Sequence, residues 1–146
     1  MITKTRLLLI GSGEGIQPTI QHAHTLHRAA DVNWQLLVLL GGADAFSFRP
    51  RPSTILVPGM PDGVIACEPT LEEFGIASRL ASTAGLPGCH DGDVTELAAM
   101  WLESLTPEVL AQTRLVVAGP AETMNAATKV AERFGVPLDD AGLTRS

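Results

Sequence analysis

The chain has 146 residues, of which 45% are hydrophobic and 18% are charged, and its formal net charge is −6. The length predicts one domain over residues 1–146. The negative charge argues against nucleic acid and anionic membranes as main partners. The low charged fraction leaves much of the chain for a core or an interface, so a homo-oligomer is compatible with it.

Two cysteines, Cys67 and Cys89, are too few for a disulfide framework, and no CxxC motif occurs. We therefore expect a reduced, cytoplasmic setting. No apolar run approaches the roughly 20 residues that span a bilayer. The N-terminal sequence MITKTR precedes only four apolar residues and no cleavage site, so no signal peptide is expected.

The first predicted unit is a strand, a glycine turn and a helix. Residues 7–10, LLLI, form a purely apolar run that is typical of a strand buried on both faces. The glycine-rich residues 11–15 follow, and a helical pattern begins next with Pro18 in its first turn. This layout aims free N–H groups and a positive helix end at a phosphate, so we interpret it as a nucleotide site.

A second buried strand is predicted over residues 34–40, ending at Gly41 and Gly42, which closes a right-handed strand-helix-strand unit. The proline-rich residues 43–63 fit no regular helix. A short strand over 53–57 is expected within them. The segment is either a functional lid or partner surface, or a stiff connector.

The second half continues the alternation of helices and strands. The sequence predicts a brief helix over 70–74 with Thr70 as its cap. It also predicts a helix over about 93–105, in which Asp93 and Glu96 resemble a capping box. Thr106 caps a further short helix that begins at Pro107. The remaining expected elements are strands over 76–82, 114–118 and 136–138, a helix over 121–134 that ends at Gly135, and a loose tail over 139–146.

Alternating strands and helices predict an α/β class, a three-layer α/β/α sandwich with a mainly parallel sheet of about five strands. Ligands of such sheets bind beyond the carboxyl ends of the strands. Three of those ends carry glycine, at residues 11–15, at 41–42, and at Gly119 with Pro120. Together they predict a cofactor crevice.

Two familiar nucleotide motifs are absent. The spacing G-x-G-x-G differs from the G-x-G-x-x-G of dinucleotide folds, and no lysine completes a P-loop. The segment IGSGEG also resembles the glycine motif of class I methyltransferases. However, Leu9 stands where that family has an acid. An S-adenosylmethionine-dependent methyltransferase remains a minor alternative.

Three further blocks of residues lie within about residues 6–137. They are Gly11, Gly13, Gly15, Ile16 and Pro18; then Gly92, Val94, Thr95 and Glu96; then Ala118, Gly119, Pro120 and Met124. With these blocks, which stand in family order, the sequence best resembles the NAD(P)-binding domain of the ferredoxin reductase family. The nearest branch looks like the electron-transfer subunits of dihydroorotate dehydrogenase and their hydrogenase relatives.

This resemblance implies a module that binds NAD(P)H and passes hydride to FAD or FMN held by a flavin-binding partner domain or subunit. It implies an oxidoreductase component that is not active alone and supplies no catalytic residue of its own. Arg79 is expected to meet a ribose or 2′-phosphate, or else to form a surface salt bridge. The expected cofactor-binding residues are Gly11, Ser12, Gly13, Glu14, Gly15, Ile16, Gly41, Gly42, Arg79, Gly119, Pro120 and Met124.

Two departures from the family pattern keep a second hypothesis open. Glu14 replaces a small residue beside the expected phosphates, where its charge is repulsive, and Ala118 replaces a cysteine. The alternative is a non-catalytic binding or regulatory module with a degenerate cofactor site. No metal site is expected, because His22 and His24 point about 200° apart on a helix.

Overall fold

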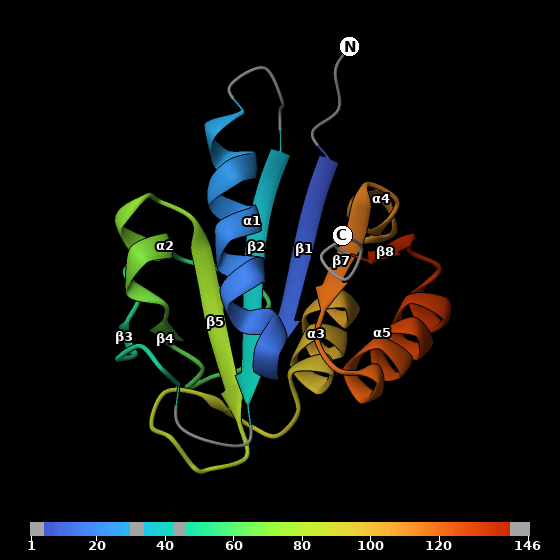
Figure 1. Ribbon diagram of the computed structural model, residues 1–146. Coiled ribbons are helices and arrows are strands. Elements are labelled where there is room, and N and C mark those ends of the chain that lie inside the picture. Colours follow the sequence, from blue (N-terminus) through green and yellow to red (C-terminus); the bar gives the residue numbers. More distant parts are fainter. Residues whose placement is uncertain (1–4, 30–33, 43–45, 141–146) are drawn as a thin grey trace.

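A fully parallel sheet of six strands forms the centre of the molecule, in the order β6-β5-β2-β1-β7-β8 (Figure 1). The computed structural model describes residues 5–29, 34–42 and 46–140. A separate antiparallel ladder pairs β3 (Arg51–Pro52) with β4 (Ala66–Cys67). The main strands are β1 (Thr5–Ser12), β2 (Trp34–Gly42), β5 (Ala77–Ser82), β6 (His90–Asp91), β7 (Thr113–Ala118) and β8 (Leu138–Asp140).

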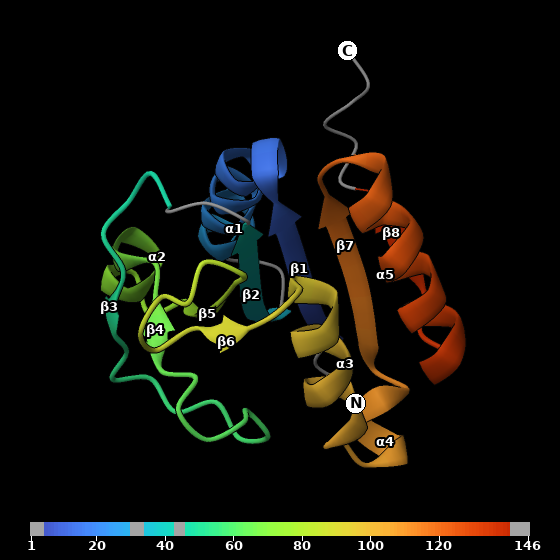
Figure 2. The ribbon, with the colours of Figure 1, turned by 90° about the horizontal axis from the view of Figure 1, so that it is seen from below.

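Helices cover both faces of this sheet, as the two views show (Figures 1 and 2). One face carries α1 (Ile16–Arg28) and α2 (Pro69–Glu73). The other carries α3 (Val94–Glu103) and α5 (Ala121–Phe134), with the single turn α4 (Pro107–Leu110) beside the start of β7. The predicted α/β/α class is therefore confirmed, with one strand more than expected.

The apolar run in β1 explains why the sheet is buried on both sides. Successive side chains of a strand point to opposite faces. Leu7 and Leu9 accordingly join the core on the α1 side, whereas Leu8 and Ile10 join the core beneath α3 and α5. All four side chains are buried. A strand with apolar residues at every position needs such a central place.

Most helix ends lie where the sequence predicted them. Asp93 accepts a hydrogen bond from Thr95 N at 2.8 Å, and Glu96 Oε1 accepts one from Asp93 N at 3.2 Å, so the predicted capping box is present. The helix over 121–134 has its predicted bounds and ends at Gly135, whose φ of 68° is left-handed. The Thr106 cap is also confirmed.

The predicted cap of α2 was wrong by two residues. Glu68, not Thr70, is the N-cap, and its carboxylate accepts a hydrogen bond from Leu71 N at 2.9 Å. Pro69 then occupies the first helical position, where its missing N–H costs nothing. A glutamate cap is outside the usual Ser, Thr, Asp and Asn set, and for that reason the pattern did not reveal it.

Two edges of the sheet also differ from expectation. The strand predicted over 136–138 begins at Leu138, so Asp139 belongs to β8 and not to a loose tail. Arg114 donates a hydrogen bond to the Asp139 carboxylate at 2.9 Å. Residues 141–146 of the predicted tail lie outside the described part of the chain. β6 was missed because it has only two residues in a turn-rich stretch.

The proline-rich segment is held by one carboxylate. The strand predicted over 53–57 is wrong. Ser53 N still donates to the Ile65 carbonyl beside the ladder at 2.8 Å, but the Ser53 hydroxyl and the N–H and hydroxyl of Thr54 donate to Glu72 of α2. The Glu72 carboxylate accepts from Ser53 Oγ at 2.7 Å, from Thr54 N at 2.7 Å and from Thr54 Oγ1 at 2.9 Å. The segment is thereby tied to the helix that precedes β5. None of the helices described is long and apolar enough to cross a membrane.

The same contacts set the ionisation of Glu72. Burial raises the pKa of this carboxyl, but the hydrogen bonds from Thr54 and Ser53 outweigh burial and lower it from 4.5 to about 2. The folded state therefore binds a proton on Glu72 less readily than the unfolded chain does. This difference stabilises the fold above pH 4.5 and is lost as the pH falls through about 2.

We predict that Glu72→Gln lowers the free energy of unfolding at pH 7 and flattens its decline between pH 4.5 and 2. Urea unfolding at a series of pH values measures both effects. Glu73→Gln is the control, since Glu73 is the exposed neighbour in the same helix. Identical pH slopes for the wild type and Glu72→Gln would contradict the role given to Glu72.

Candidate functional site

A hollow of about 390 Å³ lies at the carboxyl ends of the strands and is called here the strand-end hollow. From β1 the chain moves outward through β2 and β5 to β6, whereas from β7 it moves outward in the opposite direction to β8, so the direction switches between β1 and β7. Such a switch point is where open α/β sheets bind ligands. The lining residues are Ser12, Gly13, Gly41, Gly42, Thr83, Gly92, Asp93, Val94, Pro120, Glu122 and Thr123.

Glycines around the hollow serve two different purposes. A Cβ on Gly15 would overlap the carbonyl of Ala118, and one on Gly11 would lie 2.5 Å from Thr19 Oγ1. These two glycines let α1 pack closely on β1 and β7. Gly41 plays the same part for α3, since its Cβ would lie 2.5 Å from Val94 Cβ. The close packing of the helices therefore requires that Gly11, Gly15 and Gly41 have no side chain.

Gly13 is different, because it faces open space. Its φ is 56°, in the left-handed region, and an added Cβ would meet nothing closer than Pro120 Cδ at 3.8 Å. A side chain larger than Cβ would therefore project into the hollow or over its rim. Of the turn glycines at 11, 13 and 15, Gly13 is the one whose bare backbone borders the hollow.

Two helices begin beside the hollow without a side-chain cap. α1 has Gly15 and α5 has Pro120 at the N-cap position, and neither receives a hydrogen bond from a capping side chain. The other three α-helices described are capped, by Glu68, Asp93 and Thr106. The hollow is lined by Gly13, just before α1, and by Glu122 and Thr123 in the first turn of α5, so the positive ends of both helices lie close to it, as an anion would require. The N–H groups of Ile16 and Thr123 already donate to the carbonyls of Gly13 and Pro120.

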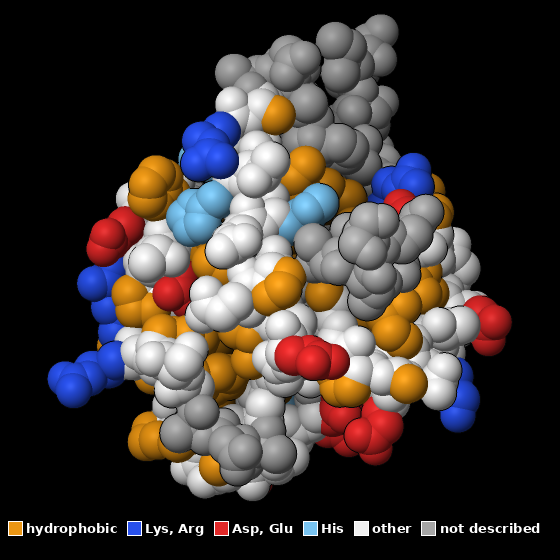
Figure 3. Space-filling view, viewed as in Figure 1, with side chains coloured by type: hydrophobic (Ala, Val, Ile, Leu, Met, Phe, Trp, Pro, Cys, Tyr) orange, Lys and Arg blue, Asp and Glu red, His pale blue; other side chains and the backbone are white. Residues whose placement is uncertain are grey.

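The side-chain charges around the hollow are negative. No lysine or arginine is among its described lining residues. The Asp93 carboxylate already accepts hydrogen bonds from the N–H and from the hydroxyl of Thr95, both at 2.8 Å. Glu122 is exposed and lines the hollow. In Figure 3 acidic side chains gather at the lower centre of the face, toward the carboxyl ends of the strands.

Glu14 does not block the hollow. Its side chain is exposed and is not part of the lining. Solvent therefore screens the repulsion expected from Glu14, whereas the carboxylate-bearing Glu122 lines the hollow itself. Glu122 could not be singled out from the sequence, because an acid in the first turn of a helix is ordinarily a favourable dipole partner.

Several of the predicted site residues lie together, whereas others do not. Ser12, Gly13, Gly41, Gly42 and Pro120 line the hollow. The remaining members of the predicted set are packed around it or away from it. Gly11, Gly15 and Gly119 make close backbone contacts, while Ile16 and Met124 are half-buried against the two cores.

Arg79 lies elsewhere and has a structural role. Its side chain is 6% exposed, and its guanidinium donates to the carbonyl of Ser78 at 2.6 Å and to that of Ile55. It ties the proline-rich segment to β5 and does not line the hollow. Neither the phosphate contact nor the surface ion pair expected of Arg79 fits this position.

Sequence reasoning did not single out Thr83 and Thr123, which line the hollow. Thr83 is the first residue after β5, and Thr123 stands in the first turn of α5. Position alone, just beyond a parallel strand or just inside a helix, was the available signal. Among the described residues, no group of three or more His, Cys, Asp or Glu side chains could hold a metal ion.

Comparison with known proteins finds the same fold in solved structures. No family model and no curated protein matches the sequence. A ferredoxin reductase of carbazole 1,9a-dioxygenase, in its FAD apo form, aligns with a TM-score of 0.53 and 16% identity over 93% of this chain. Two structures of the C-terminal domain of a Pyrococcus furiosus hydrogenase align with TM-scores of 0.49, at 13% and 14% identity, over 93% and 96% of this chain and 90% and 93% of theirs.

The chain thus has a ferredoxin reductase-like fold. It spans 34% of the length of that reductase. At 16% identity the similarity concerns the fold and not the activity.

We predict that Gly15→Ala lowers the free energy of unfolding by more than about 2 kcal/mol, because the new methyl group overlaps backbone that cannot move cheaply. Gly75→Ala is the control. Gly75 has a φ of 77° with nothing near its Cβ, so backbone strain alone costs about 1 kcal/mol. Urea unfolding compares the two, and an equal or smaller loss for Gly15→Ala would contradict the packing role.

Proposed function

We propose that this chain is the pyridine-nucleotide-binding module of a flavin-dependent electron-transfer oxidoreductase. The observation that carries the proposal is the meeting of two uncapped helix N-termini at the sheet's switch point. Backbone N–H groups arranged in this way favour a diphosphate. The ferredoxin reductase-like fold is consistent with such a module.

The residues of the hollow fit the middle of a dinucleotide. Gly13 leaves room for an approaching diphosphate, and the first turn of α5, which lines the hollow, adds its positive helix end. The hydroxyls of Ser12, Thr83 and Thr123 add polar groups for riboses. The volume of about 390 Å³ is within the usual range for small-molecule sites.

This chain's part in the reaction is binding and orientation. The nicotinamide ring of a bound NAD(P)H would supply the hydride, and a partner domain or subunit would hold the flavin that accepts it. Ala118 is 9% exposed in β7 and carries no polar group, so this position contributes no proton transfer. The chain alone is therefore expected to bind nucleotide without turnover.

A non-catalytic binding module is the second candidate, and the charge of the hollow favours it. Asp93 and Glu122 both line the hollow, and no lysine or arginine is among the described lining residues. Repulsion of a diphosphate by two carboxylates opposes the attraction of the helix ends. The nucleotide-binding module requires that the attraction of the helix ends exceed the repulsion of the carboxylates, and the non-catalytic module requires the reverse.

We predict that calorimetric titration with NADH or NADPH gives saturable heat, and that Gly13→Val abolishes it because the side chain occupies the ligand's space. Gly63→Val is the control, since Gly63 also has positive φ and open surroundings but lies outside the hollow. S-adenosylmethionine, which a methyltransferase would bind, is expected to give no heat. If neither NADH nor NADPH gives heat, the nucleotide-binding proposal is contradicted and the non-catalytic module is the remaining candidate.

We also predict that Glu122→Gln tightens nucleotide binding roughly fivefold, as expected for removing about 1 kcal/mol of repulsion. Glu14→Thr is expected to have a smaller effect, because Glu14 is not part of the lining. Glu132→Gln, farther along α5, is the control for net charge. Weaker binding by Glu122→Gln would show that this carboxylate makes a useful contact with the ligand.

A further inference from the structure

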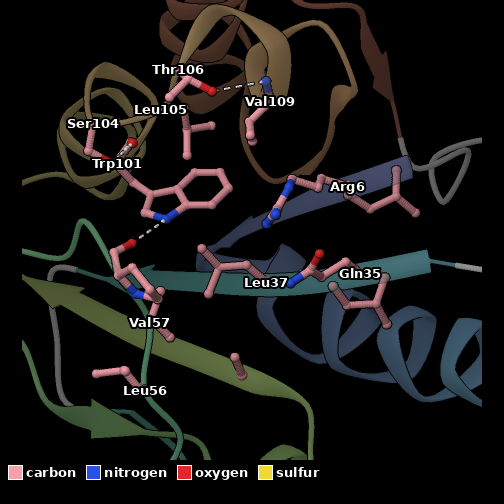
Figure 4. A pocket seen from close by; sticks show the side chains of 14 residues that line it. Arg6, Gln35, Leu37, Leu56, Val57, Trp101, Ser104, Leu105, Thr106 and Val109 are labelled. Carbon is pink, nitrogen blue, oxygen red and sulfur yellow. Dashed lines mark hydrogen bonds between the residues drawn. The ribbon is translucent and has the colours of Figure 1, made fainter. Parts of the chain in front are cut away.

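A second cavity, of about 270 Å³, opens at the amino end of the sheet and is called here the amino-end cavity (Figure 4). Its floor is the start of β1 and β2, where Arg6 pairs in register with Gln35. Six residue steps of β1 separate Arg6 from Ser12, which places the cavity about 20 Å from the strand-end hollow. The two sites are therefore separate.

The cavity contains one cation without a described counter-charge. Arg6 and Gln35 project from the same face of the sheet as Leu8 and Leu37, and Figure 4 shows the guanidinium pointing inward. Neither side chain takes part in a hydrogen bond or ion pair within the described residues, and no Asp or Glu is among those lining the cavity. Because a guanidinium stays charged, it favours an anionic ligand.

Apart from Ser104 and Thr106, the remaining walls are apolar. Leu37, Val57, Leu105 and Val109 surround the cavity, together with the ring of Trp101. Trp101 Nε1 donates to the carbonyl of Pro58 at 3.2 Å, which holds the indole against the proline-rich segment. A rigid aromatic wall beside aliphatic side chains accepts a flat or branched hydrocarbon group at little conformational cost.

We propose that the amino-end cavity binds a small organic monocarboxylate with a compact apolar body. The carboxylate accepts two parallel hydrogen bonds from Arg6, the geometry that a guanidinium fork favours, and the body lies between Leu37 and Trp101. A single arginine matches one negative charge better than a doubly charged phosphate. The volume is below the roughly 300 Å³ at which sites for drug-sized ligands begin, so the ligand is small.

Phenylacetate and its neutral analogue phenylacetamide test this proposal with the wild-type chain. We expect calorimetry to give a dissociation constant of about 1 mM or below for phenylacetate, and at least tenfold weaker binding for the amide. The Trp101 indole N–H signal is expected to shift during a parallel NMR titration. No binding of phenylacetate, or equal binding of the amide, would overturn the proposal.

Arg6→Gln is expected to weaken phenylacetate binding at least tenfold, while Arg49→Gln leaves it unchanged. Arg49 is exposed on the segment after β2 and does not line the cavity, so it controls for the loss of one positive charge. Thermal unfolding verifies that both variants fold. Unchanged affinity in Arg6→Gln, or shifts confined to the strand-end hollow, would contradict the assignment. Failure of nucleotide binding has no bearing on this result.

Discussion

The close packing of Gly15 against the backbone of β7 is the constraint on which the candidate site depends. Any side chain at this position would overlap the Ala118 carbonyl. With glycine there, α1 begins directly beside the end of β7, and α5 begins three residues after that strand. Two positive helix ends are thus held at one switch point. The geometry follows from excluded volume before any ligand is considered.

Much of the fold could be predicted from local patterns. The apolar residues 7–10 indicated a strand covered on both faces, because such a strand needs an apolar residue at every position. The Asp93–Glu96 pair indicated a helix start, because a capping box has a recognisable residue spacing. Neither the Glu68 cap nor the Glu72 contacts with Ser53 and Thr54 could be recognised from a sequence pattern. The Glu68 cap uses a residue type outside the usual capping set, and the Glu72 contacts join residues that only tertiary structure brings together.

The candidate site, like the fold, was predicted only in part. The sequence located the glycine-marked strand ends but could not separate packing glycines such as Gly41 from Gly13, whose backbone borders the hollow. It also could not show that Arg79 is buried beneath the proline-rich segment, or that Glu122 rather than Glu14 lines the hollow. Residue type and spacing reveal conformational needs, whereas solvent exposure depends on the folded chain.

The central claim is that main-chain N–H groups at the starts of α1 and α5 receive the anionic part of a dinucleotide. Amide-resolved NMR during titration with NADH tests it most directly. The account predicts that the largest shift changes fall on residues 13–15 and 121–123 and saturate together, as donors to one ligand must. Saturable shifts confined to other parts of the chain, or none at all, would contradict it.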